Sequence, residues 1–103
     1  MKQKISCLWF LLVLALIPQR ASAYTECTVN ISRIWIGDDG YLWLLYTNGG
    51  SGYLLPNDPD REGTLSAGTT ALVAQRQMIV RYQADGVACT STGRSDLVGV
   101  YLL

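Results

Sequence analysis

The sequence predicts an α+β fold, in which a small, curved, mostly antiparallel sheet or open barrel of five to six strands carries one helix. Two runs rich in aromatic and β-branched residues flank Asp39-Gly40, a dipeptide typical of tight hairpin turns. A segment with helical spacing of apolar residues follows in the middle of the chain. Alternating segments then lead to an apolar end, which indicates further strands.

The first 23 residues have the pattern of a secretory signal peptide. Lys2 and Lys4 form a positive start, residues 5–17 are almost all apolar, and Ala21-Ser22-Ala23 is a small-residue cleavage site. The apolar run is shorter than the roughly 20 residues that cross a membrane as a helix. We therefore expect a secreted or periplasmic protein with no membrane contact after cleavage, in which residues 24–103 form a single α+β domain.

Strands are expected at 28–36 and 41–47, joined by Asp39-Gly40 as a two-residue type I′ turn. That loop would place Ile34 opposite Leu45, and Trp35 opposite Leu44. Both faces of this hairpin are apolar, whereas a hairpin with one solvated face alternates apolar and polar residues. One face should lie on the core, and the other needs a cover: the helix, the far wall of a barrel, or a second subunit.

The remaining elements follow in order. Residues 53–55 form a short strand that ends at Pro56, which cannot donate to a sheet ladder. A helix is expected at 64–76, and Gly68 would allow it to lie close to the sheet. Its expected apolar side consists of Leu65, Thr69, Leu72 and Arg76, widened by Ala71, Val73 and Ala74. Further strands are expected at 77–83, at 87–89 after a second Asp-Gly turn, and at 96–103.

Two cysteines remain once Cys7 leaves with the leader. They are Cys27, at the start of the first strand, and Cys89, late in the domain. In an oxidising compartment this single possible pair predicts a disulfide that joins the first strand to a late segment.

The predicted domain is mildly acidic, with five Arg against eight carboxylates and no Lys. It lacks the basic footprint of a nucleic-acid binder. The absence of His from the whole chain excludes Ser-His and Cys-His catalytic pairs, so we expect no enzyme, no cofactor and no metal site. One alternative stays open, because the acidic loop 57–63 begins like a calcium-binding loop, although Thr69 stands where the bidentate Glu should be.

The aromatic residues give the best indication of function, because those of the predicted domain are all Trp and Tyr. Such side chains combine an apolar body with a polar tip and favour interfaces. The candidate ligand-binding residues cluster around the second and third strands and a nearby cation: Tyr41, Trp43, Tyr46, Tyr53 and Arg33.

The order of elements resembles that of small exported bacterial proteins. A leader and an early Cys precede a hairpin and an Ala-containing helix; the strand Gln77-Met78-Ile79-Val80-Arg81-Tyr82, Cys89 and an apolar terminal strand follow. In outline this layout is similar to the cell-binding B subunits of AB5 toxins. The resemblance implies an OB-like barrel with one helix and a disulfide, and an exported module that could form a homo-oligomeric ring.

The sequence therefore predicts an exported, non-enzymatic binding module that recognises a glycan or a protein through an aromatic face. The alternative is a periplasmic inhibitor or immunity-type protein that blocks a secreted enzyme, using a protruding loop at 56–63 or 90–95.

Overall fold

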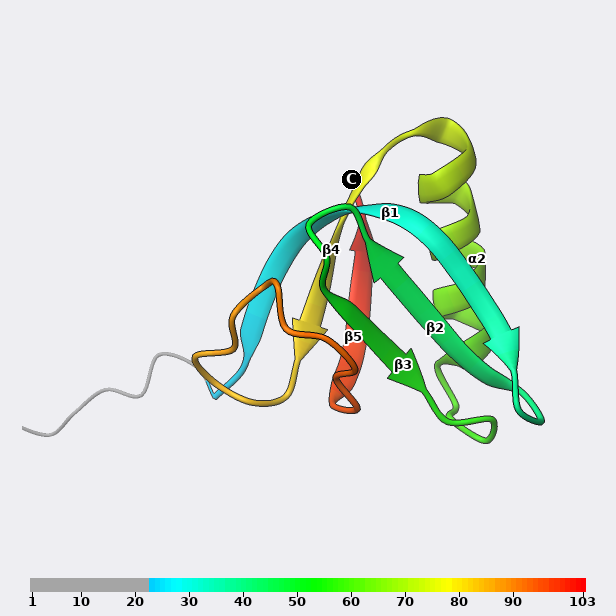
Figure 1. Cartoon of the computed structure of the whole chain (residues 1–103), viewed down its shortest axis with the longest axis horizontal. Helices are drawn as coiled ribbons and strands as arrows, with labels where there is room; N and C mark the ends of the chain where they lie inside the picture. The colour runs from blue at the N-terminus through cyan, green and yellow to red at the C-terminus, as the bar shows by residue number, and fades with distance from the viewer. Residues whose placement is uncertain (1–22) are drawn as a thin grey trace, which may run out of the picture.

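In the computed structural model, which describes residues 23–103, an antiparallel open sheet of five strands carries one helix (Figure 1). The order of strands in the sheet is β3-β2-β1-β4-β5. The elements are β1 (Thr25–Gly37), β2 (Tyr41–Tyr46), β3 (Ser51–Leu54), α2 (Arg61–Ala74), β4 (Gln77–Tyr82) and β5 (Leu97–Leu102). The predicted fold class is confirmed, and the sheet does not close into a barrel.

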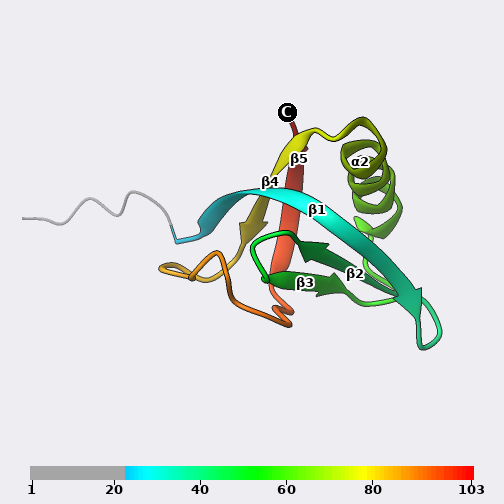
Figure 2. The same ribbon diagram turned by 45° about the horizontal axis from the view of Figure 1, so that its top comes forward.

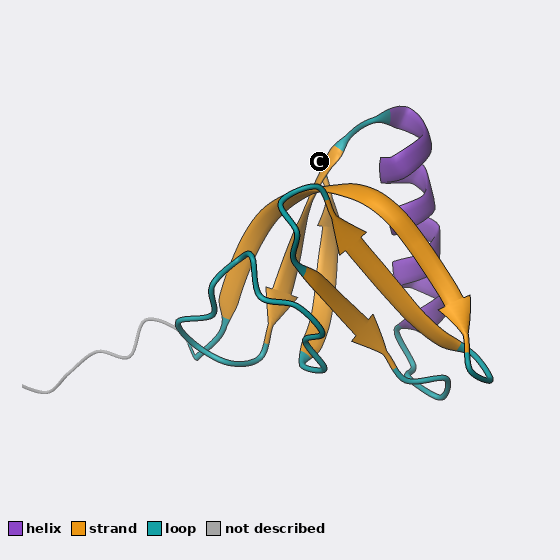
Figure 3. Ribbon diagram, viewed as in Figure 1, coloured by secondary structure: helices purple, strands orange, loops and turns teal. Residues whose placement is uncertain are grey.

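The long first strand connects the two halves of the sheet. Its first half, Thr25 to Asn30, pairs with β4, and its second half pairs with β2. A bulge between Ile31 and Arg33 shifts the register. Before the bulge the odd-numbered side chains, such as Val29, are buried, and after it Ile34 packs against the core. The strand arches between the two halves (Figure 3), so that the sheet curves around its core.

The hairpin register differs by one residue from the predicted register. Asp38 and Asp39 adopt φ of 51° and 67°, and Gly40 then takes φ 110°. The backbone N–H of Gly40 donates to the carbonyl oxygen of Gly37 over 3.2 Å. The turn is therefore centred on Asp38-Asp39, with three residues between the strands. Positive φ is tolerated by Asp, which allows the turn to start one residue earlier than a pure Asp-Gly turn would.

This shift decides which side chains share a face. Trp35 lies opposite Trp43, and Ile34 lies opposite Leu44, where the predicted register paired them with Leu44 and Leu45. Leu44 is fully buried, whereas Trp35 is 45% exposed. The correction moves both indoles onto one side of the sheet and leaves the aliphatic partners on the side that faces the helix.

Helix α2 lies on the inner side of the sheet (Figure 2). A Cβ at Gly68 would be 3.0 Å from Leu44 Cδ2 and 3.4 Å from Ile34 Cδ1, so glycine allows the close approach that the sequence suggested. The buried helix residues are Thr64, Gly68 and Ala71. The predicted side is confirmed in part: Ala71 is buried and Leu65 packs against the core, whereas the other predicted residues are exposed. A helix this close to a sheet buries its small residues.

The helix also begins and ends earlier than predicted, at 61 and 74 rather than 64 and 76. Gln75 takes a left-handed conformation with φ 53°, and the N–H of Arg76 donates to the carbonyl of Ala71. This C-terminal cap ends the helix directly before β4.

Residues 83–96 form a loop, so the strand predicted at 87–89 is wrong. The edge of β4 that such a strand would need is occupied by β5. The loop is held instead by Thr25, whose hydroxyl donates to the carbonyl of Ala84 and accepts from the N–H of Val87. The predicted disulfide is confirmed: Cys27 and Cys89, 62 residues apart, are bonded with a Cα–Cα distance of 5.6 Å.

The end of this loop runs beside β3. Gly52 and Arg94 form an isolated parallel bridge, and Ser51 donates its N–H to the carbonyl of Ser91. Below them, the hydroxyls of Tyr46 and Tyr82 lie 2.7 Å apart in the core, where the two residues are 3% and 0% exposed.

The predicted leader, residues 1–23, lies outside the described residues except for Ala23. Within residues 23–103 no helix is long and apolar enough to cross a membrane.

Candidate functional site

The outer side of the β1–β2–β3 half carries a row of aromatic side chains. Trp35 of β1 lies opposite Trp43 of β2, and Trp43 lies opposite Tyr53 of β3. The rings of Trp43 and Tyr53 stack with centroids 4.7 Å apart and an angle of 21° between their planes. Tyr41 adds a tilted contact to Tyr53 at 6.0 Å. Cross-strand pairing thus aligns aromatic rings from three neighbouring strands on one surface, which we call the aromatic face.

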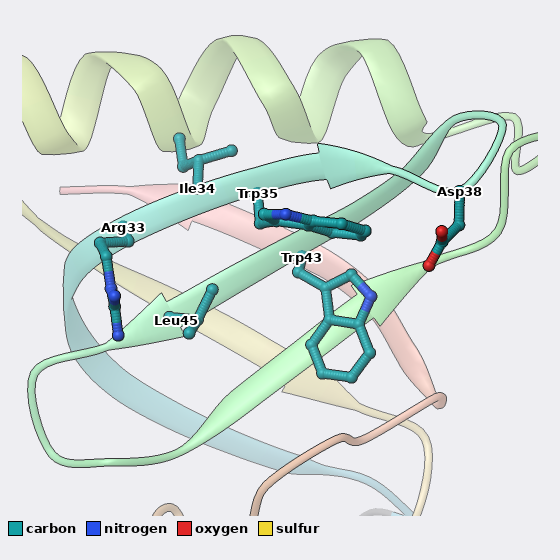
Figure 4. A pocket seen from close by; sticks show the side chains of 6 residues that line it. All are labelled: Arg33, Ile34, Trp35, Asp38, Trp43 and Leu45. Atoms are coloured by element: carbon teal, nitrogen blue, oxygen red, sulfur yellow. The ribbon is translucent and has the colours of Figure 1, made fainter.

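An open groove of about 400 Å³ lies on this face, lined by Arg33, Ile34, Trp35, Asp38, Trp43 and Leu45. In Figure 4 the two indoles occupy its middle, with Arg33 at one end and Asp38 at the other. The groove therefore offers an apolar floor between a cation and a carboxylate. Its volume is within the range of small-ligand sites in proteins.

The position of Trp35 depends on Gly37. A Cβ at Gly37 would lie 2.4 Å from Trp35 Cζ2 and 2.5 Å from Cη2, which no side chain could occupy without moving the ring. The indole therefore lies flat along its own strand, over the glycine, and keeps one face toward solvent. Gly37 is a positioning residue for the aromatic face.

The charged groups of the groove are available to a ligand. Within residues 23–103, neither Arg33 nor Asp38 forms a side-chain hydrogen bond or ion pair with another side chain. Arg33 is exposed, and it leaves five guanidinium donors free for a carboxylate, hydroxyl or carbonyl oxygen.

A second cluster of aromatic and charged residues, on the β1–β4–β5 half, is bonded within itself. The Arg81 guanidinium lies 4.1 Å above the ring of Tyr24, donates to Glu26 over 2.8 Å and donates to the hydroxyl of Tyr101 over 2.7 Å. The hydrogen bond to Glu26 raises the pKa of Arg81 above its usual value. With the Nε and Nη2 donors of Arg81 engaged, this cluster links neighbouring strands and offers fewer free donors to a ligand than Arg33 does.

Of the five predicted binding residues, the structure brings four together. Tyr41, Trp43, Tyr53 and Arg33 lie on the aromatic face. Tyr46 does not, because its side chain points into the core, where only 3% of it is exposed.

Sequence reasoning missed Trp35 and Asp38. The two-residue turn placed Trp35 on the face opposite Trp43, and Asp38 lay beyond the predicted strand 28–36, where it was not a candidate site residue. The run Asp38-Asp39-Gly40 was the available signal, since a three-residue loop restores the Trp35–Trp43 pair.

Two carboxylates of the acidic loop, those of Asp58 and Glu62, have partners within the loop. Asp58 accepts the backbone N–H of Asp60, and Arg61 donates to the carbonyl of Gly40 over 2.7 Å and to Glu62. Within residues 23–103 no group of three or more acidic, His or Cys side chains is arranged to hold a metal ion.

No protein-family model, curated protein or solved structure matches the chain. The resemblance to toxin B subunits therefore stays a prediction, and the functional argument depends on the geometry of the aromatic face.

Proposed function

We propose that this protein is an exported, non-enzymatic binding module that holds a glycan or a segment of a protein on the aromatic face. The observation that carries the proposal is the groove lined by Trp35 and Trp43, in which the Trp35 indole is 45% exposed and the Trp43 indole, stacked on Tyr53, is partly exposed. An indole ring can pack against the C–H face of a sugar or against an apolar side chain, because each of these presents apolar surface to the ring.

The polar ends of the groove would orient the ligand. Arg33 and Asp38 flank the indoles, so a ligand with hydroxyls or opposite charges at its two ends fits better than a uniformly apolar one. An exposed apolar surface with charged residues at its rim is typical of an interaction site.

Export is part of the same proposal. The bonded pair Cys27–Cys89 is the type of cross-link that persists in oxidising compartments, and the predicted leader supplies the route. We propose that the protein acts in the periplasm or outside the cell.

The inhibitor alternative receives less support from the loops it would use. In loop 90–95 the carbonyl of Ser91 accepts from Ser51, and Arg94 both donates to Ser51 and accepts from Tyr53. Their backbone groups are paired with β3 and are not free to pair with an enzyme.

The test uses the exported, disulfide-bonded protein on a glycan array and, in parallel, on immobilised secreted proteins of the same cells. Trp35→Ala and Trp43→Ala should each weaken binding about tenfold, since a stacked indole contributes on the order of 1–2 kcal/mol. Tyr101→Ala is the matched control for Trp35, because it removes a ring of similar exposure (48% against 45%) from another part of the sheet.

Equal losses in the two Trp variants and in the Tyr101 control would contradict an aromatic-face site. Binding that depends on loop 90–95 and not on the indoles would favour the inhibitor alternative. Light scattering of the same preparation tests whether the module forms the homo-oligomeric ring that the resemblance implies.

A further inference from the structure

Strand β5 is the last strand of the sheet, and one of its edges is open. It pairs with β4 such that Val100 lies opposite Val80 and Leu102 opposite Met78. The N–H of Leu103 donates to the carbonyl oxygen of Gln77, so these two residues form a hydrogen-bonded pair. In an antiparallel ladder hydrogen-bonded and non-hydrogen-bonded pairs alternate, so the pairs of Leu102 and Val100 with β4 are non-hydrogen-bonded. The peptide groups of Val100 and Leu102 consequently point away from β4, where no other strand within residues 23–103 pairs with them.

This edge lacks most of the features that prevent strand pairing. Residues 97–103 contain no charged residue and no proline. A bulge at the start of β5, where Val98 is the extra residue between the pairs Arg81–Gly99 and Tyr82–Leu97, leaves residues 99–102 regular. Val98, Tyr101, Leu102 and Leu103 are 43–48% exposed. An exposed, apolar and regular edge strand is a template for an added strand.

A groove of about 410 Å³ lies along this edge. One side is formed by Val98, Gly99 and Val100 of β5; the other consists of Pro59, Asp60, Gly63, Thr64 and Ala67, at the start of α2. Two of the residues that line the groove are glycines, and a Cβ built at Gly63 or Gly99 would meet no atom within 4 Å. A strand edge flanked by a helix leaves room for both the backbone and the alternate side chains of an extended peptide.

The charge of the groove indicates which occupant fits. Asp60 is one of its lining residues, and within the described residues the Asp60 carboxylate forms no hydrogen bond or ion pair. The adjacent cation, Arg61, is directed to Gly40 and Glu62. Asp60 is exposed, and the edge strand of a second copy carries no cation, so self-pairing through β5 would bring no positive charge to this carboxylate.

We propose that the β5–α2 groove binds an extended, apolar peptide segment of another protein, which adds to β5 as a further strand and places a basic residue against Asp60. The site lies on different elements from the aromatic face, so the protein would hold two partners at once.

The experiment is an amide NMR titration of the exported, disulfide-bonded protein. The probes are capped hexapeptides of alternating Val and Thr, each with one Lys at a different position. At least one should shift the amides of residues 98–100 saturably. The same peptide with Glu for Lys, or with alternate backbone nitrogens methylated, should bind at least tenfold more weakly.

Variants locate the site. Asp60→Asn should remove the preference for Lys over Glu, while Asp85→Asn, in the distant 83–96 loop, should preserve it. Val100→Pro removes one outward N–H without touching the β4 ladder and should abolish binding. Ala67→Leu fills the groove from the helix side and gives an independent test if the proline variant does not fold.

The proposal would be overturned if none of the six peptides, one for each position of the Lys, gave saturable shifts. It would also be overturned if the methylated peptide bound as tightly as the unmethylated one. If the amides of residues 98–100 shifted with protein concentration in the absence of peptide, and the measured mass doubled, β5 would pair with a second copy of the chain and the proposal would be overturned. Trp35→Ala should leave the peptide titration unchanged, which separates this site from the aromatic face.

Discussion

The pair of buried phenols, Tyr46 and Tyr82, allows a quantitative test of the core. Their hydroxyls lie 2.7 Å apart, and each is the other's side-chain partner. Gly52 packs over them: a Cβ there would be 3.1 Å from the Tyr46 hydroxyl and 3.3 Å from the Tyr82 ring. Little room is left for water, so removing one hydroxyl leaves the other buried without a partner.

Tyr46→Phe and Tyr82→Phe should each lower the free energy of unfolding by about 1–3 kcal/mol, the cost of a buried unpaired hydroxyl. The double variant removes both polar groups, so it should be destabilised by less than the sum of the single variants. We expect a coupling free energy of about 1–2 kcal/mol. Urea unfolding of the disulfide-bonded proteins measures all four members of the cycle. Strict additivity would refute the reasoning.

The same pair predicts alkaline sensitivity. Burial raises the pKa of both phenols in the folded state, and the hydrogen bond to Tyr82 raises that of Tyr46 further. In the unfolded chain they titrate near pH 10, so stability is full below that pH and falls above it by about 1.4 kcal/mol per pH unit for each phenol that stays protonated. The double Phe variant should have a flatter alkaline limb, and an unchanged limb would contradict the assignment.

Two further substitutions test the scaffold and the aromatic face. Cys89→Ala should lower the free energy of unfolding by about 4 kcal/mol, because the bond to Cys27 closes a loop between residues 62 positions apart. The melting temperature should fall by roughly 15–30 °C. A loss of unfolding free energy below about 1 kcal/mol would contradict this expectation. Gly37→Ala should displace the Trp35 indole, and this should change both the tryptophan fluorescence and the near-ultraviolet circular dichroism. The free energy of unfolding should fall by only about 1 kcal/mol. Unchanged spectra would show that the position of the ring does not depend on this glycine.

The sequence predicted the elements well where local chemistry is decisive. The alternation of Met78, Val80 and Tyr82 with neighbours that are on average less apolar predicted β4, and a continuous apolar run predicted β5. Two cysteines in a domain with a predicted leader allowed one disulfide, and that disulfide is present. The helix was located because its spacing is helical, although its ends were shifted by two to three residues.

The site required tertiary information. A one-residue difference in the hairpin loop decides whether Trp35 shares a face with Trp43, because successive side chains in a strand point to opposite sides. Local propensity does not distinguish the two turns, since Asp38, Asp39 and Gly40 all tolerate positive φ.

The sequence by itself determined the composition of each strand, the class of fold and the single possible cross-link. Only the tertiary structure decided which face of each element is buried. Helix α2 packs through Gly68 because small residues permit the closest approach to β1 and β2, and Tyr46 is in the core because the register turns it toward Tyr82. Both outcomes depend on contacts between segments distant in sequence, and no local pattern encodes those contacts.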